Sequence, residues 1–189
     1  MKYDILLCGV GGQGVLSLAA IIAEAAVAEG LRVRQSEVHG MAQRGGAVLA
    51  HLRVSDAEIH SDLIPGGGAA MILSMEPLES LRYTDFLSPD GVLISAKEPV
   101  VNIPDYPGIE DIYAAIEKFP RHSLVPALEL AKKAGGPRAV NMVLVGAASK
   151  YLPLKPESLE NAVQARFASK GEATVQMNIE ALRSARSLP

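Results

Sequence analysis

The sequence contains a single cysteine, Cys8, among its 189 residues. A disulfide within one chain needs two cysteines, and an iron–sulfur cluster or a cysteine-rich zinc site needs more, so this chain cannot supply such a site by itself. The four histidines do not occur at the spacings H-x-x-x-H or H-E-x-x-H, which place two ligands on one helix face. We therefore expect no metal site on this chain.

Long hydrophobic runs, a signal peptide and a basic patch are missing as well. No stretch reaches the roughly 18 uninterrupted apolar residues that suggest a membrane span, and the first residues, Met1–Asp4, lack the features of a signal peptide. The 18 basic residues are scattered and the net charge is −3, which gives no electrostatic footprint for DNA or RNA. We expect a cytoplasmic protein that binds neither membranes nor nucleic acid.

The familiar catalytic signatures are also absent from the sequence. There is no G-x-S-x-G nucleophile turn, no G-K-[ST] phosphate loop and no convincing pair of catalytic carboxylates. Cys8 lies within an apolar segment, where a cysteine acts as a small hydrophobic residue more often than as a nucleophile. We predict no catalytic residue on this chain.

The hydrophobic pattern predicts alternating strands and helices. Short apolar or alternating runs predict strands at 3–8, 31–37, 47–54, 69–74 and 92–95, the last after a turn at 88–91. Helices are predicted at 12–30, 77–86, 109–118, 124–134, 138–151, 156–168 and 172–186, with a proline-rich loop at 96–108.

This order of elements is typical of an α/β fold. We expect a three-layer, Rossmann-like, mostly parallel sheet with helices on both faces and a helical C-terminal region. Hydrophobic residues make up 49% of the chain but aromatics only 4%, so small aliphatic side chains must build the core. We predict one domain over residues 1–189, with a motif-bearing α/β part at 1–95 and a mainly helical part at 109–189.

The segment Gly9–Gly14, with the sequence GVGGQG, matches G-x-G-x-x-G between a predicted strand and a predicted helix. Glycines allow a sharp turn, so that backbone N–H groups and the positive helix N-terminus can approach a phosphate or carboxylate. The same turn could instead only pack the helix closely against the sheet or a partner protein. A dinucleotide site also has an acidic residue about 20 residues further on. The candidate, Glu37, is more distant, and both interpretations stay open.

A second polar segment, Ser36–Gly46, has the sequence SEVHGMAQRGG. Loops that leave neighbouring parallel strands lie side by side, so we expect it next to the glycine turn, forming one surface. Arg44 can bind an anion through two hydrogen bonds, and His39 can donate or accept a proton near neutral pH. Alternatively, the segment is a capped loop with a solvated arginine. The candidate binding residues of both segments are Gly9, Gly11, Gly12, Gln13, Gly14, Ser36, His39, Gly40, Met41, Gln43, Arg44, Gly45 and Gly46.

Together, the two segments resemble the gamma-type subunit, or gamma domain, of the 2-oxoacid:ferredoxin oxidoreductases. The second segment is more similar to the indolepyruvate branch, where this piece is called the beta subunit, than to the pyruvate or 2-oxoglutarate branches. The resemblance runs over essentially the whole chain. It implies a subunit, inactive alone, of an oxidoreductase that converts an arylpyruvate and coenzyme A to an acyl-CoA and reduces ferredoxin.

The resemblance also implies that the cofactors lie elsewhere. Thiamine diphosphate and iron–sulfur clusters would belong to a large partner subunit, coenzyme A would be a co-substrate, and no cofactor is expected on this chain alone. The surface expected to face the partner's active site consists of Gly11, Gly12, Gln13, Gly14, His39, Gln43, Arg44 and Gly46. Two alternatives are a stand-alone Rossmann-type protein that binds a free nucleotide and a purely structural assembly subunit. The isolated chain could also form a homodimer.

Overall fold

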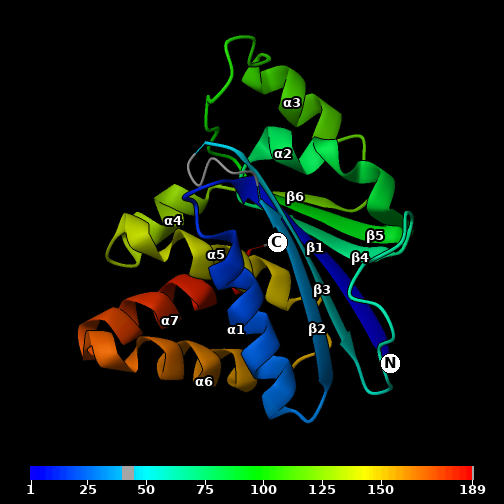
Figure 1. Ribbon diagram of the computed structural model, residues 1–189. Helices are drawn as coiled ribbons and strands as arrows, with labels where there is room; N and C mark the ends of the chain where they lie inside the picture. Colours follow the sequence, from blue (N-terminus) through cyan, green and yellow to red (C-terminus); the bar gives the residue numbers. More distant parts are fainter. Residues whose placement is uncertain (40–44, 189) are drawn as a thin grey trace.

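The structure is a computed structural model of the chain and describes residues 1–39 and 45–188. Its centre is a six-stranded sheet with the order β2-β3-β1-β4-β5-β6 (Figure 1). The strands are β1 (Lys2–Val10), β2 (Arg32–His39), β3 (Ala47–Ser55), β4 (Ala69–Ser74), β5 (Leu87–Ala96) and β6 (His122–Val125).

The sheet is mostly parallel, but β3 runs against its two neighbours. Parallel ladders join β1 to β4, β4 to β5 and β5 to β6, whereas β3 pairs antiparallel with both β1 and β2. The β2–β3 pair is therefore an antiparallel hairpin, in register from Arg32 opposite Ser55 to His39 opposite Val48. We expected the second segment to leave a parallel strand next to the first strand, and this is wrong, because β3 lies between β1 and β2.

Helices cover both faces of the sheet (Figure 1). The helices α1 and α4–α7 lie on one face and α2 and α3 on the other, as the residues of two hydrophobic clusters also indicate. Their bounds are α1 (Val15–Ala28), α2 (Pro77–Arg82), α3 (Ile109–Ile116), α4 (Ala127–Lys133), α5 (Val140–Ser149), α6 (Pro156–Phe167) and α7 (Glu172–Arg186). Three short 3₁₀ turns occur at Thr84–Phe86, Pro137–Ala139 and Ala168–Lys170. None of the helices in the described ranges is long and apolar enough to cross a membrane.

Alternate residues of each central strand enter opposite halves of the core, as a pleated strand requires. In β1, Ile5 and Leu7 pack with the larger cluster, which contains residues of α1, α5 and α7. Leu6 and Cys8 face the smaller cluster under α3. The larger cluster joins the sheet to the C-terminal helices, and the predicted α/β class with a helical C-terminal region is confirmed.

Two local predictions are wrong. Residues 122–125 form β6, where the sequence predicted a loop and the start of a helix, and α4 begins only after Pro126. The predicted turn at 88–91 lies inside β5, where the pairing with β4 shifts from Leu87 opposite Ala69 to Val92 opposite Met71. The shift is a bulge, so the turn-forming residues distort the strand without ending it.

Candidate functional site

The two segments singled out in the sequence meet at one end of the sheet. β1 ends at Val10, and the backbone of Gly11 then forms two hydrogen bonds with the residues that precede β3. Gly11 N–H donates to the carbonyl of Gly46 at 2.7 Å, and Gly45 N–H donates to the carbonyl of Gly11 at 3.2 Å. The predicted proximity of the segments is confirmed, although it arises from the antiparallel pairing of β1 with β3 and not from parallel neighbours.

Gln13 closes the crevice between β1 and β4 with its own side chain. Its amide oxygen accepts from Val10 N–H at 2.7 Å, and its amide nitrogen donates to the carbonyl of Met75, just after β4, at 3.0 Å. The connections after β1 and β4 lead to helices on opposite faces, so this is the topological switch point at which open α/β sheets bind ligands. The Gln13 amide occupies the Val10 N–H and the Met75 carbonyl, which a ligand in the crevice would otherwise contact, so this arrangement disfavours a free dinucleotide at the glycine turn.

Two glycines of the turn are required by close approach. A Cβ at Gly9 would lie 2.9 Å from atoms of Gln13, Val15 and Met75, so only glycine lets the start of α1 pack this tightly on the strand. Gly14 has φ +86° and caps α1, and its carbonyl accepts from the Asn141 side chain at 2.9 Å. The glycine pattern therefore has a packing role here, whatever else it binds.

The remaining candidates, from the second segment, do not all lie beside the glycine turn. Ser36 lies within β2 opposite His51, four positions along β3 from Ala47, or about 13 Å at a strand's rise per residue, so it is not brought to the glycine turn. His39 ends β2. The candidates Gly40, Met41, Gln43 and Arg44 lie outside the described residues.

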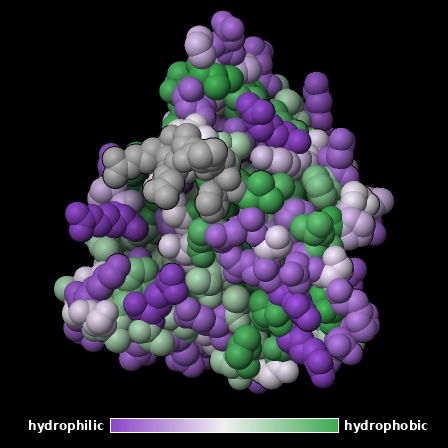
Figure 2. Space-filling view, viewed as in Figure 1, coloured by the Kyte–Doolittle hydropathy of each residue, from purple (hydrophilic) through white to green (hydrophobic). Residues whose placement is uncertain are grey.

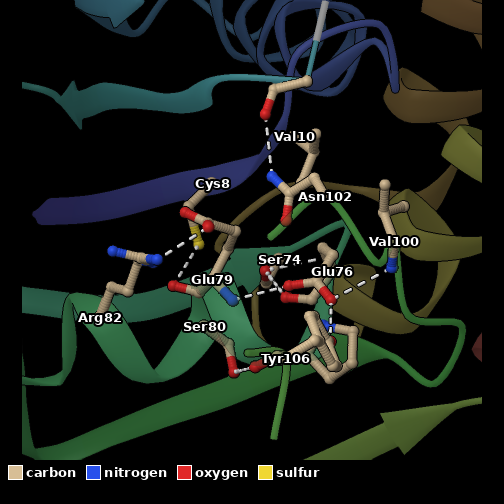
Figure 3. Close-up of polar contacts among 12 residues, drawn as sticks. Cys8, Val10, Ser74, Glu76, Glu79, Ser80, Arg82, Val100, Asn102 and Tyr106 are labelled. Atoms are coloured by element: carbon tan, nitrogen blue, oxygen red, sulfur yellow. Dashed lines mark hydrogen bonds and ion pairs between the residues drawn. The ribbon is translucent and has the colours of Figure 1, made fainter. Parts of the chain in front are cut away.

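Glu76, which the sequence reasoning did not select, is the best-connected side chain at this end of the sheet (Figure 3). It follows β4, is 1% exposed and caps α2 by accepting from Glu79 N–H at 2.8 Å. Its other carboxylate oxygen accepts from Val100 N–H at 3.3 Å and from the Tyr106 hydroxyl. The available signal was an acidic residue directly before Pro77, which is typical of a helix start.

Glu76 thereby fastens the proline-rich loop to the sheet, and that loop reaches the second segment. Asn102 in the loop donates its side-chain amide to the carbonyl of Gly45 at 2.8 Å. The neighbouring Val101 is 69% exposed, and hydrophobic residues are visible at the surface over this loop in Figure 2. The loop and the two glycine segments therefore form one continuous surface, here called the motif face, defined by Gly11, Gly12, Gly45, Val101 and Asn102.

Cys8 is fully buried in β1, on the face of the sheet covered by α2 and α3. Burial raises the pKa of its thiol to about 12, and the nearby carboxylates of Glu79 and Glu76 add to this although a hydrogen bond with Ser74 opposes it. A thiol of this kind is neither a nucleophile nor a metal ligand at neutral pH. The interpretation of Cys8 as a small core residue is confirmed.

Glu79 carries a second buried carboxylate. Burial raises its pKa, the ion pair with Arg82 at 3.0 Å opposes this, and the neighbouring Glu76 raises it further. One of its oxygens, Oε2, is buried without a hydrogen-bond partner among the described atoms. Such an oxygen is satisfied best when the carboxyl is protonated.

A cavity of about 360 Å³ opens beside the glycine turn, on the face covered by α1, α4 and α5. The lining residues come from the ends of β4 and β5 and the starts of α1, α4 and α5. The apolar wall consists of Met75, Ala96, Leu128, Pro137 and Val140. The four polar side chains are Gln13, Glu98, Arg138 and Asn141.

The described residues do not fit a metal centre. No group of three or more histidine, cysteine, aspartate or glutamate side chains within residues 1–39 and 45–188 is placed to hold a metal ion. With one buried cysteine, this chain also has no thiolate set for an iron–sulfur cluster.

The mostly parallel sheet, the glycine turn at the start of α1 and the helices on both faces define a Rossmann-like α/β protein. The chain belongs to the pyruvate ferredoxin/flavodoxin oxidoreductase family, whose model matches residues 4–188. Among its relatives, indolepyruvate oxidoreductase subunit IorB of Archaeoglobus fulgidus is 38% identical, with 97% of this chain and 93% of that one covered.

Solved structures share the fold. The gamma subunit of a keto/oxoacid ferredoxin oxidoreductase from Geobacter sulfurreducens is 27% identical and matches with a TM-score of 0.64 over 97% of this chain and 99% of its own. A 2-oxoglutarate:ferredoxin oxidoreductase from Magnetococcus marinus, with 2-oxoglutarate, coenzyme A and succinyl-CoA bound, matches with a TM-score of 0.76 at 21% identity. All of this chain is covered, but it spans only 32% of that one.

Proposed function

We propose that this chain is the cluster-free subunit of an indolepyruvate-type 2-oxoacid:ferredoxin oxidoreductase and is inactive alone. The observation that supports this best is the motif face, a built surface of glycines and polar groups that carries no catalytic side chain of its own among the described residues. Family membership and the 38% identity to an IorB subunit give the reaction class. The chain would complete an active site on a larger partner.

The cofactors of the reaction would be held by that partner. Thiamine diphosphate and iron–sulfur clusters, with coenzyme A as co-substrate, perform oxidative decarboxylation of an arylpyruvate and reduce ferredoxin in such an enzyme. This chain would contribute the residues of the turn and the second segment, which line the partner's active site or the coenzyme A entrance. They are Gly11, Gly12, Gln13, Gly14, His39, Gly40, Met41, Gln43, Arg44, Gly45 and Gly46; Ser36 lies too far along the hairpin and Gly9 is buried, so neither is included.

The organisation of the protein is part of the same proposal. The shared hydrophobic cluster supports one domain over residues 1–189, in which the α/β part and the C-terminal helices fold together. The protein would act in the cytoplasm, and a homodimer would occur only when the partner is missing.

The test is reconstitution with the large subunit encoded in the same genome. Arylpyruvate-dependent ferredoxin reduction is measured for the large subunit with and without this chain, and we expect activity only in the complex. Substitution Arg44→Ala should lower that activity with assembly intact. Full activity of the large subunit alone would contradict the proposal.

A matched pair of glycine variants examines the described part of the motif face. Gly12 and Gly30 both have positive φ, at +99° and +80°, and open space where a side chain would project. Gly12→Asn should therefore lower the activity of the complex, whereas Gly30→Asn, at the far end of α1, should not. Equal effects would show that the motif face is not a contact surface.

The two alternatives give different results in the same assays. A stand-alone nucleotide-binding protein would bind a nucleotide saturably as the isolated chain. A purely structural subunit would lose assembly and activity together on motif substitution. Loss of activity in an intact complex distinguishes the proposed role from both.

A further inference from the structure

The cavity between α4 and α5 contains two opposite charges that do not meet. Glu98 follows β5, and its Oε1 accepts from Leu128 N–H, at the start of α4, at 2.9 Å. Its Oε2 is buried and has no hydrogen-bond partner within the described part of the chain. A buried acceptor without a donor is destabilising and calls for a ligand group or a bound water.

Arg138 is exposed and lines the rim of the same cavity from the 3₁₀ turn before α5. It makes no hydrogen bond or ion pair with any residue that the structure describes, Glu98 included. A guanidinium group with free donors binds carboxylates and phosphates through paired hydrogen bonds. The cavity thus has a carboxylate in its wall and an exposed guanidinium group at its rim.

The rest of the cavity is apolar. Met75, Leu128 and Val140 belong to its wall, and Asn141 adds an amide whose nitrogen is already bonded to Gly14. A mainly hydrophobic pocket with a few orienting polar groups is the usual form of a small-molecule site, and about 360 Å³ lies at the small end of the range. This size excludes a dinucleotide and fits a compact molecule with an apolar body.

We infer that this cavity binds a small zwitterion with an apolar side chain, such as an α-amino acid. Its ammonium group would donate to Glu98, whose buried carboxylate would turn towards the cavity on binding, and its carboxylate would accept from Arg138, while the side chain lies against Met75 and Val140. The site adjoins the glycine turn, because Gln13 lines both, but its lining residues all belong to this chain, and its ligand need not take part in the proposed reaction. The inference therefore does not depend on the partner subunit.

The test is isothermal titration calorimetry on the full-length chain with L-phenylalanine as the probe. Phenylacetate lacks the ammonium group and 2-phenylethylamine lacks the carboxylate, so each analogue retains one of the two polar contacts. We expect saturable binding of one L-phenylalanine per chain and at least about tenfold weaker binding of either analogue. Binding of an analogue as tight as that of L-phenylalanine would overturn the inference.

Two variants assign the charges. Glu98→Gln keeps an oxygen that can cap α4, and it should weaken L-phenylalanine binding about tenfold but leave phenylacetate unchanged. Arg138→Gln should also weaken L-phenylalanine binding but leave 2-phenylethylamine unchanged. Glu117→Gln, beyond α3 on the opposite face of the sheet, serves as the control and should change neither.

The competing explanation is that Glu98 and Arg138 pair with each other in solution and leave no site. In that case Arg138→Gln would destabilise the chain towards urea, and no probe would bind saturably. Either the absence of saturable binding or binding that is unaffected by both variants overturns the inference.

Discussion

Asn141, at the start of α5, donates its side-chain amide to the carbonyl oxygen of Gly14 at 2.9 Å, across 127 positions of sequence. Gly14 is the residue that precedes α1, so one side chain from the C-terminal helices fixes the N-terminus of the first helix. The turn that the sequence marked with glycines is thus held from both sides, by Gln13 towards the sheet and by Asn141 from α5.

This contact makes Gly14 sensitive to substitution. In Gly14→Ala the backbone has φ +86° and the new Cβ would lie 2.7 Å from Asn141 Nδ2. We expect a loss of about 1–3 kcal/mol in the free energy of unfolding, measured by urea denaturation. Gly30→Ala has similar φ and open space, so it should lose less, and equal losses would show that the Asn141 contact is unimportant.

Tyr106 should stabilise the proline-rich loop through the buried carboxylate of Glu76. A hydrogen bond to a charged acceptor contributes about 1.5–3 kcal/mol, so Tyr106→Phe should lower the free energy of unfolding by about that amount. Tyr113→Phe is the control, because the Tyr113 hydroxyl bonds only to the exposed carbonyl of Lys97 and should matter less. If the two variants are equally stable, Glu76 does not hold this loop.

Gly146 lies where α5 crosses α7, and a Cβ there would lie 2.0 Å from the carbonyl oxygen of Leu182. Because the obstacle is backbone, Gly146→Ala must displace a helix, and overpacking of this kind costs about 1–3 kcal/mol or more. Thermal unfolding should show a lower Tm for Gly146→Ala than for Gly66→Ala, whose Cβ would meet its nearest neighbour at an ordinary 3.7 Å. A tolerated Gly146→Ala would mean that α5 and α7 are packed less closely.

Glu79 should make stability depend on pH. Its pKa is raised in the folded protein, mainly by burial, so between the ordinary value of 4.5 and the raised value the folded state binds more protons than the unfolded state. The free energy of unfolding should therefore fall as pH rises through that window. In Glu79→Gln this slope should be weaker.

A control with the opposite sign is available at Glu129. Hydrogen bonding and attraction to Lys133 lower its pKa, so its contribution is present above pH 4.5 and lost as pH falls. Removing it by Glu129→Gln should leave the slope caused by Glu79 intact. An unchanged slope in Glu79→Gln would contradict the assignment.

Cys8 should be protected from alkylation in the folded protein. With a pKa of about 12, only about one thiol in ten thousand is ionised at pH 8, and the side chain is fully buried. Its reaction with iodoacetamide should follow the rate of unfolding, whereas the exposed position in Ser169→Cys should react at once. Rapid reaction of Cys8 in native buffer would place β1 outside the core.

Much of the fold was predictable because its signals are local. The strand at 3–8 and the helix that follows it were found from an apolar run and a glycine at Gly30, which has φ +80° just after α1. β6 was not, because four residues are too few to show a period, and its last two residues were assigned to the helix predicted at 124–134. The direction of β3 was not predictable either, since alternation looks the same in parallel and antiparallel strands.

The candidate site was predicted in part for the same reason. The glycine pattern is visible in the sequence, so the turn could be predicted. The hydrogen bond from Gln13 to the carbonyl of Met75 could not, because the two residues are 62 positions apart. Glu76 accepts from Glu79 in its own helix start and from Val100 and Tyr106 in the proline-rich loop, and no spacing in the sequence brings that loop to Glu76. Long-range contacts of this kind are visible only once the chain is folded.

The second segment is anchored on both sides, by the β2–β3 pairing and by the backbone bonds to Gly11. On the β2 side, His39 pairs with Val48. On the β3 side, the backbones of Gly45 and Gly46 are hydrogen-bonded to Gly11. Residues between these anchors can change in number and kind at a small entropic cost, since loop closure depends only weakly on length. On the proposed function, exchanging residues 40–44 between relatives of different substrate specificity should transfer recognition without refolding the sheet.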